Sequence, residues 1–341
     1  MPIEVDFHLP FPAPRPERAE VERAGQRAVR WAHDHGLLQP TDSALGYYVG
    51  MMLADVAAGF CPDASGADLE LMTDVIVWTA VCDDFFDGPA GDDLEQATSI
   101  VDELIAVTEH PPITPTDGGV LVNATADLWT RLIEPMSDRW RERARQSWQR
   151  FLRSFLAEVI ARRSRVVPTL DDYLALRRES MAMYLYLDAT ERVNRYEVPS
   201  SILASEEIRR LGLLEIDIIA FCNDVHSVEH EEARGDTHNL VLVLEHEGRG
   251  TREAVIEEIC RLVHDKSEQF LSIAAEIPAL CRRVGATANE QAITQRYVTA
   301  MTHQIRVTHD WSMATRRYSS HASDTANSAD PAGRRQYLAF S

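Results

Sequence analysis

Apolar residues recur at three- and four-residue steps along almost the whole chain. This period is that of one face of an α-helix, whereas a half-buried strand needs strict alternation, which we do not find. The sequence therefore predicts an all-α fold, a single domain of ten or more helices without internal repeats. The segments with the clearest helical period are Ala19–His35, Ala44–Phe60, Leu69–Phe86, Leu94–Thr108, Trp140–Ile160, Tyr173–Leu187, Ser205–Val228, Arg252–Ala275 and Gln291–Tyr318.

The two ends of the chain differ from this helical part. Residues 1–17 contain four prolines at alternate positions, which predicts an extended arm. Residues 319–341 begin with a run rich in Ser, Ala, Asp and Gly, which predicts a flexible tail. We therefore expect one folded domain over residues 18–318.

The charge and the cysteines narrow the class of protein. The chain has 34 Lys and Arg against 54 Asp and Glu, a net charge of −20. Nucleic acids and anionic membranes attract the opposite charge, so we expect neither as a partner. The five cysteines form no CxxC pair, and no signal peptide or membrane span is apparent. These features predict a cytoplasmic protein with no stable membrane association.

The first unusual feature is an acidic cluster at the end of an apolar helix. Asp83, Asp84 and Asp87 follow the stretch Val75–Cys82, which is among the most apolar of the chain. Negative charge is unfavourable at the C-terminal end of a helix, because the helix dipole favours cations there. Asp83 and Asp87 are four residues apart and share a helical face. Converging carboxylates of this kind bind Mg²⁺, although a solvated acidic helix end is the alternative interpretation.

The second unusual feature is a polar stripe in the segment Ser205–Val228 and just beyond it. Asn223, Ser227 and Glu231 recur every four residues and so lie along one face of a helix. An amide, a hydroxyl and a carboxylate are all oxygen ligands, which suit Mg²⁺.

A zinc site is an alternative for the same helix. His226, Glu229 and His230 fit the H-x-x-E-H pattern of inverted zinc peptidases. This interpretation lacks an evident third ligand and leaves the acidic cluster at 83–87 unexplained. A third interpretation is that these residues simply lie at the surface.

Together, the two oxygen-rich segments resemble the motifs of bacterial class I terpene synthases. Residues 83–87 are similar to the aspartate-rich D-D-x-x-D motif of that family, and residues 223–231 to its N-D-x-x-S-x-x-x-E motif. The first residues of the two segments are 140 positions apart, which is within the usual range of the family. The resemblance extends over roughly Val5 to Tyr318 and includes residues 231–236, which resemble pentalenene synthase and its relatives.

The resemblance implies a helical bundle around a central apolar cavity, in which an allylic diphosphate is ionised and the carbocation is cyclised. Farnesyl diphosphate is the expected substrate, and a sesquiterpene hydrocarbon or alcohol the expected product; geranyl or geranylgeranyl diphosphate is the alternative. The implied metal is Mg²⁺, three ions per active site with diphosphate bound, for which Mn²⁺ can substitute. The implied metal ligands are Asp83, Asp87, Asn223, Ser227 and Glu231.

The resemblance also implies the residues around the substrate. Arg178, Arg317 and Tyr318 are the expected catalytic residues at the diphosphate, with Arg177 as the alternative to Arg178. The residues expected to contact substrate in addition are His230, Arg234, Trp78, Phe86 and Trp311.

Two positions depart from the family pattern. His230 stands where relatives have Lys or Arg, and Ala182 stands where they have Gly at a helix kink.

A trans-prenyltransferase is a further alternative, but it would carry a second D-D-x-x-D segment in place of residues 223–231. We expect a monomer or a homodimer.

Overall fold

A computed structural model describes residues 5–38, 48–88, 91, 93–109, 119–315 and 317 of the chain. In these residues every regular element is a helix, which confirms the predicted all-α class. None of these helices is both long and apolar enough to cross a membrane. The helices are α1 (Arg18–Asp34), α3 (Leu53–Phe60), α4 (Gly66–Phe86), α5 (Leu94–Glu109), α6 (Val120–Ile133), α7 (Asp138–Ser164), α8 (Leu170–Ser180), α9 (Met183–Val193), α10 (Ser200–Leu203), α11 (Glu206–Arg234), α12 (Leu240–His246), α13 (Arg252–Arg283) and α14 (Ala288–Ala314).

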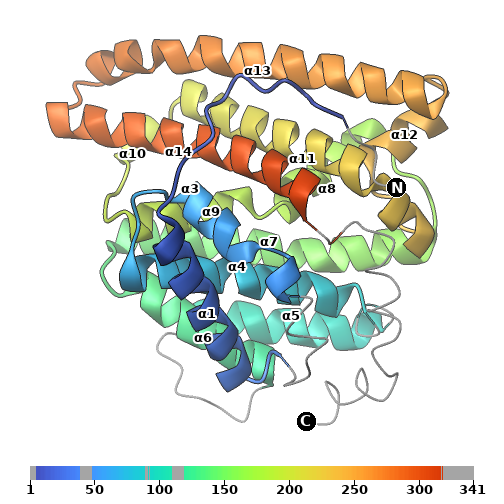
Figure 1. The fold of residues 1–341 in the computed structure, drawn as a ribbon, viewed down its shortest axis with the longest axis horizontal. Coiled ribbons are helices and arrows are strands. Elements are labelled where there is room, and N and C mark those ends of the chain that lie inside the picture. The colour runs from blue at the N-terminus through green and yellow to red at the C-terminus, as the bar shows by residue number, and fades with distance from the viewer. Residues whose placement is uncertain are drawn as a thin grey trace.

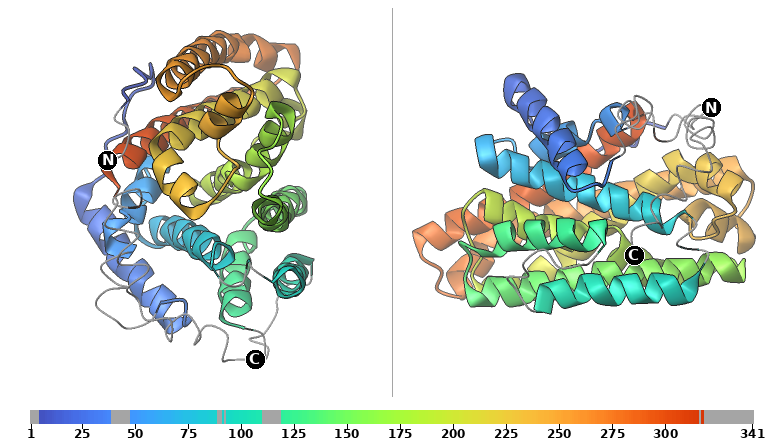
Figure 2. Two further views of the ribbon diagram at one scale, coloured as in Figure 1. Left: turned by 90° about the vertical axis from the view of Figure 1, so that its right-hand side faces the viewer. Right: turned by 90° about the horizontal axis from the view of Figure 1, so that it is seen from below.

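The helices form two packed groups that are joined by α9. Helices α11, α12, α13 and α14 lie together on one side, and α1, α3, α4, α5, α6 and α7 on the other (Figures 1 and 2). Each group has its own cluster of buried apolar side chains. Helix α9 contacts α4, α7 and α14 and so joins the two groups. The C-terminal ends of α4, α7, α11 and α14 lie at one end of the bundle, where the site described below is found.

Residues 5–17 run as an extended arm across the outside of α13 and α14 (Figure 1). Phe7, Leu9 and Phe11 of this arm are buried. The ring of Phe11 meets that of Phe270 on α13 edge to face, with the centroids 5.5 Å apart. The arm is thus held by alternate apolar side chains that cover the groove between the two helices.

The predicted segment Tyr173–Leu187 is not one helix but two. Helix α8 ends at Ser180 and α9 begins at Met183. Between them Ala182 has a φ of 59°, in the left-handed region that non-glycine residues seldom adopt. The break between the two helices therefore lies at Ala182, the residue that departs from the family pattern. The chain adopts the left-handed conformation there although alanine, unlike glycine, has a Cβ atom.

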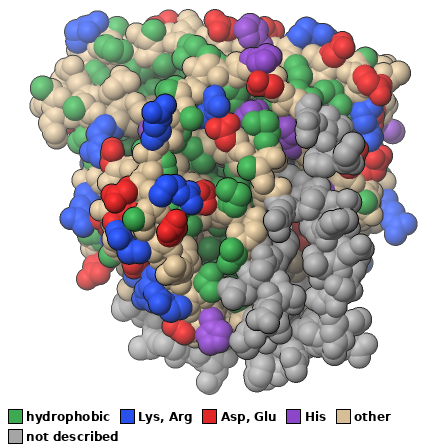
Figure 3. All heavy atoms as spheres, in the orientation of Figure 1, with side chains coloured by type: hydrophobic (Ala, Val, Ile, Leu, Met, Phe, Trp, Pro, Cys, Tyr) green, Lys and Arg blue, Asp and Glu red, His purple; other side chains and the backbone are tan. Residues whose placement is uncertain are grey.

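The surface carries both signs of charge. On the face seen in Figure 3, acidic and basic side chains are interspersed rather than gathered into one patch. The excess of negative charge is therefore not concentrated on this face.

Candidate functional site

Helix α4 carries Asp83 and Asp87 to the end of the bundle. Its interior is packed on nearly all sides, with Val75, Trp78 and Cys82 almost fully buried. The helix ends at Phe86, and Asp87 follows as its cap, with its N–H bonded to the carbonyl of Asp83. The apolar stretch thus fixes the helix, and the carboxylates emerge where it ends.

Helix α11 carries the second motif. Ser205 caps its start by accepting a hydrogen bond from the N–H of Ile208, and the helix is buried almost continuously from Leu214 to Val228. It ends at Gly235, whose φ of 80° suits glycine and turns the chain back towards the site. The stripe of Asn223, Ser227 and Glu231 therefore lies in the C-terminal part of α11.

A polar pocket separates the ends of these two helices. It has a volume of about 130 Å³ and contains residues of both predicted motifs. Ser227 is fully buried beside it and is not itself part of the lining. The lining residues are Asp83, Asp87, Glu158, Arg162, Arg177, Asn223, His230, Glu231, Arg234, Asp236, Thr237, His238 and Arg317.

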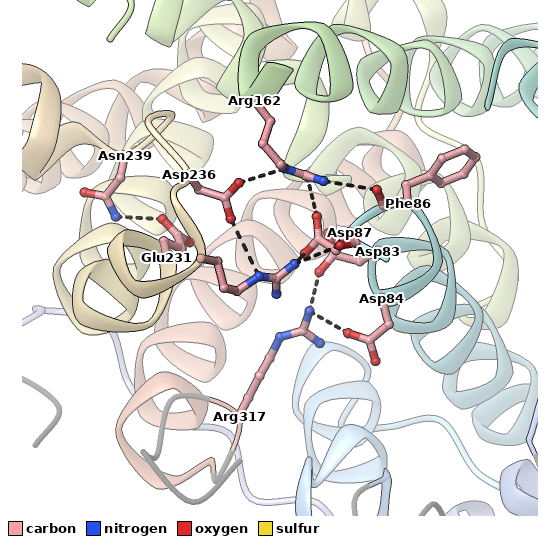
Figure 4. A network of polar contacts seen from close by, with 10 residues as sticks. Asp83, Asp84, Phe86, Asp87, Arg162, Glu231, Asp236, Asn239 and Arg317 are labelled. Atoms are coloured by element: carbon pink, nitrogen blue, oxygen red, sulfur yellow. Dashed lines mark hydrogen bonds and ion pairs between the residues drawn. The ribbon is translucent and has the colours of Figure 1, made fainter. Parts of the chain in front are cut away.

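Arginines bridge the acidic residues across this pocket (Figure 4). Arg317, which follows α14, pairs with Asp83 and lies 3.3 Å from Asp84. Arg234, at the end of α11, is 2.8 Å from Asp87. Two of the three arginines predicted to bind diphosphate therefore stand against the aspartate cluster, whose negative charge they offset. Tyr318, the third predicted catalytic residue, lies outside the described residues.

Two carboxylates at the pocket have raised pKa values. Desolvation and the neighbouring Asp87 raise the pKa of Asp83 to about 6, against the lowering effect of Arg317. Desolvation, together with Asp224, raises the pKa of Glu231 to about 7. A cation placed near such a carboxylate stabilises its ionised form.

The predicted Arg178 does not line the pocket. This residue is directed away from the pocket and forms two 2.8 Å hydrogen bonds to the buried Asp217, which also accepts from Lys266. Its neighbour Arg177 lines the pocket and donates to Asn223 and Asp224 at 2.8 and 2.6 Å. Successive residues of a helix point about 100° apart, so only one of the two arginines can face the pocket. The alternative, Arg177, is the one that does.

Two of the three predicted substrate-contacting aromatic residues are packed elsewhere. The indole of Trp78 stacks on Trp148 of α7 at a centroid distance of 4.7 Å and donates to Thr125 of α6. Phe86 is fully buried and stacks on Phe155 of α7 at 4.5 Å. Both rings therefore fix α4 to its neighbours and do not line the polar pocket, and their contact with substrate stays a prediction.

Trp311 and His230 have different surroundings. Trp311 is half-buried on α14, and its indole N–H donates to the carbonyl of Met51 at 2.6 Å. Part of its surface remains exposed, so its role as a substrate contact stays a prediction.

His230 lines the pocket, where desolvation and the nearby Arg234 lower its pKa. A neutral imidazole at this position can donate one hydrogen bond but adds no charge.

The zinc interpretation finds no site. In the part of the chain that the structure describes, no three His, Cys, Asp or Glu side chains lie close enough together to hold a metal ion on their own. His226 is buried against Phe7 and His309, with its ring centroid 5.8 and 5.9 Å from theirs, whereas Glu229 is exposed. A catalytic zinc needs three protein ligands, and the H-x-x-E-H residues do not supply them.

Five residues of the pocket lining were not predicted as site residues from sequence: Glu158, Arg162, Asp236, Thr237 and His238. Arg162 of α7 donates to Asp87 at 2.6 Å and to Asp236 at 2.8 Å. Glu158, one turn earlier, also lines the pocket, and desolvation raises its pKa to about 8. Desolvation lowers the pKa of His238 to about 3. Arg162 lies in an arginine-rich stretch that looks like an ordinary helix end, so no local signal marked it.

The residues fit a hard divalent cation. Asp83, Asp87, Asn223 and Glu231 present oxygen ligands to one pocket, and burial raises the pKa of both Asp83 and Glu231. Mg²⁺ prefers such ligands and takes its remaining ones from water and phosphate oxygens. This explains why carboxylates alone form no complete metal site here.

Comparisons with known proteins agree with this geometry. The family model described as "Terpene synthase family 2, C-terminal metal binding" matches residues 74–269. Pentalenene synthase of Streptomyces avermitilis is 32% identical over 94% of this chain and 94% of its own length. Pristinol synthase of Streptomyces pristinaespiralis is 34% identical over 97% of this chain and 88% of its own.

Solved structures show the same fold. The crystal structure of an α-eudesmol synthase superposes with a TM-score of 0.83 at 27% identity, covering 91% of this chain and 99% of the other. A linalool/nerolidol synthase from Streptomyces clavuligerus gives a TM-score of 0.80 at 29% identity, covering 90% of this chain and all of the other. The relatives are terpene synthases, not prenyltransferases or peptidases. The chain therefore belongs to terpene synthase family 2 and is an enzyme of the class I terpene synthases.

Proposed function

We propose that this terpene synthase uses Mg²⁺ to ionise farnesyl diphosphate and cyclises the resulting carbocation to a sesquiterpene hydrocarbon or alcohol, releasing diphosphate. The observation that carries the proposal is the pocket in which Asp83 and Asp87 of α4 face Asn223 and Glu231 of α11. A (−)-β-caryophyllene synthase of Saccharothrix espanaensis that is 32% identical to this chain cyclises farnesyl diphosphate.

The metal ligands would divide between the two walls of the pocket. Asp83 and Asp87 would hold Mg²⁺ on the α4 side, and Asn223, Ser227 and Glu231 on the α11 side, with three ions in all once diphosphate is bound. Bound Mg²⁺ supplies the positive charge that stabilises the departing diphosphate. Mn²⁺ has the same preference for oxygen ligands and would substitute for it.

The arginines would bind the diphosphate oxygens. Arg162, Arg177, Arg234 and Arg317 line the pocket from four different segments of the chain, and each is paired with an aspartate. Guanidinium groups bind phosphate oxygens through paired hydrogen bonds, so these side chains would stabilise the leaving group as it departs.

Substrate entry requires the pocket to open. At about 130 Å³ it is smaller than the 300 Å³ or so of an ordinary small-molecule site, and the pairs Arg317–Asp83 and Arg234–Asp87 cross it. Diphosphate would draw the arginines from the aspartates, whose oxygens then become available to Mg²⁺. Closure around the diphosphate would exclude water, which protects the carbocation.

Two other chain lengths are alternatives for the substrate. A solved structure of the linalool/nerolidol synthase contains 2-fluorogeranyl diphosphate and is 29% identical to this chain. Geranyl diphosphate is therefore the second candidate substrate, and geranylgeranyl diphosphate the third.

The test is to incubate the purified chain with Mg²⁺ and the ten-, fifteen- and twenty-carbon diphosphates. We expect diphosphate release and a fifteen-carbon cyclic product by gas chromatography–mass spectrometry, both abolished by chelation. Asp83→Ala and Asn223→Ala should lose activity, whereas Glu232→Ala should keep it, because Glu232 is exposed and pairs with Arg252. Absence of diphosphate release from all three substrates would contradict the proposal.

A further inference from the structure

Asn239 is a fully buried residue just beyond the pocket-lining His238. It is the N-cap of α12, where its side-chain oxygen accepts a hydrogen bond from the N–H of Val241 at 2.9 Å. Its amide nitrogen donates to the backbone carbonyl of Asp224 at 2.8 Å and to Oε2 of Glu231 at 2.9 Å. The last of these contacts is drawn in Figure 4.

The orientation of this amide is fixed by the backbone on both sides. The N–H of Val241 can only donate, and the carbonyl of Asp224 can only accept. The oxygen of Asn239 must therefore face α12, and its two N–H groups must face α11. Consequently Glu231 always meets a hydrogen-bond donor at this position.

The surroundings hold Asn239 rigidly in place. Asp224 is itself fully buried, and its Oδ2 accepts from the hydroxyl of Tyr173 and the N–H of Leu240, each at 2.7 Å. Its Oδ1 accepts from Arg177 at 2.6 Å. Both oxygens of Asp224 are thus occupied, so this motif residue joins α8, α11 and α12 and is not free to bind a metal.

We propose that Asn239 is a positioning residue, which orients the carboxylate of Glu231 for metal binding. The inference rests on the proposed function. Its basis is that one oxygen of Glu231 is tied to a donor of fixed direction, so that the carboxylate plane is set before metal arrives. Hydrogen bonds of this kind to metal ligands typically change metal affinity 10–100-fold.

The experiment uses Asn239→Ser and Asn239→Thr in the full chain. Ser and Thr keep an N-cap oxygen for α12 but are too short to reach Glu231, and they add no charge. The matched control is Asn194→Ser, which removes an amide that donates to the carbonyl of Thr190 at the end of α9, outside the pocket. Mg²⁺ binding in the presence of inorganic diphosphate is measured by calorimetry, and the melting temperature is measured without metal.

We expect wild type and Asn194→Ser to bind Mg²⁺ alike, and both Asn239 variants to bind it 10–100-fold more weakly. The Mg²⁺ concentration for half-maximal activity should rise to match, while metal-free melting temperatures stay close to wild type because the cap is kept. Unchanged Mg²⁺ affinity in whichever Asn239 variant retains the wild-type melting temperature would overturn the inference. If wild type itself bound no Mg²⁺ with diphosphate, the proposed function would fail instead.

Discussion

Arg177 Nη2 lies 2.8 Å from the amide oxygen of Asn223, whereas the next residue, Arg178, forms a bidentate pair with Asp217. The two adjacent arginines therefore serve different sides of α11. Arg177 faces the polar pocket, and Arg178 joins α8 to the buried pair of Asp217 and Lys266.

This arrangement predicts opposite effects for two similar substitutions. Arg177→Gln should lower the rate of diphosphate release about 10–100-fold, since a charge-assisted hydrogen bond contributes about 1.5–3 kcal/mol. Arg178→Gln should keep most of the activity but lower the free energy of unfolding by about 1–2 kcal/mol, because Asp217 is buried and keeps only Lys266. Rates and urea unfolding of the two variants check this. A larger loss of activity in Arg178→Gln than in Arg177→Gln would reverse the assignment.

Sequence periodicity predicted the class of fold because most helices here are apolar on the face they bury. It missed α6, where the buried position Thr125 is polar in sequence and yet packs inside, since it accepts the indole N–H of Trp78. The short α12 was missed for a similar reason, because only its cap, Asn239, marks where it begins. Local composition does not show that a polar residue has a partner from a distant helix.

The metal motifs could be predicted because their spacing lies within single helices. The pocket residues Arg162 and Glu158 could not, because they come from α7, which has no recognisable motif and reaches the site only through packing. Whether Arg177 or Arg178 faces the pocket depends on how α8 is rotated about its axis. An alignment to the family motif that is uncertain by one residue does not fix this rotation. The packing of the helices against one another thus decides which residues of α7 and α8 reach the pocket, and the sequence pattern alone does not show this packing.

The close approach of α3 and α14 gives a prediction on packing. A Cβ atom at Gly59 would lie 2.6 Å from Cγ2 and 2.7 Å from Cγ1 of Val307. Gly59→Ala should therefore lower the free energy of unfolding by about 1–3 kcal/mol, as overpacked sites do. The double variant with Val307→Ala should lose less than the sum of the single variants, because the clash is removed. Additive losses in urea unfolding would show that the two residues are not in conflict.

The left-handed conformation of Ala182 gives a prediction on the helix break. Ala182→Gly should raise the free energy of unfolding by up to about 1 kcal/mol, because the left-handed region costs an L-residue about that much. Ala189, which is buried in the interior of α9, is the control, and Ala189→Gly should lower stability by about 1 kcal/mol. Melting curves of both variants check the opposite signs, and a loss of stability in Ala182→Gly would contradict the strained break.

Glu215 is a buried acid away from the polar pocket. It lies on α11 with no exposed surface, and neither carboxylate oxygen has a hydrogen-bond partner among the described residues. Desolvation raises its pKa well above the ordinary value, so that folding favours the protonated form of this group. In the unfolded chain the same group ionises above a pH of about 4.3.

This difference predicts a stability that falls as pH rises. A group whose pKa is raised by folding stabilises the folded state below its unfolded pKa and loses that contribution as pH rises towards its folded pKa. Glu215→Gln removes the titration, so its advantage over wild type should grow between pH 5 and pH 8, by at most about 1.4 kcal/mol per pH unit. Urea unfolding at pH 5, 6.5 and 8 measures this, and all other titrating groups cancel between the two proteins. A difference that stays constant with pH would show that folding does not raise the pKa of Glu215, which would contradict the prediction.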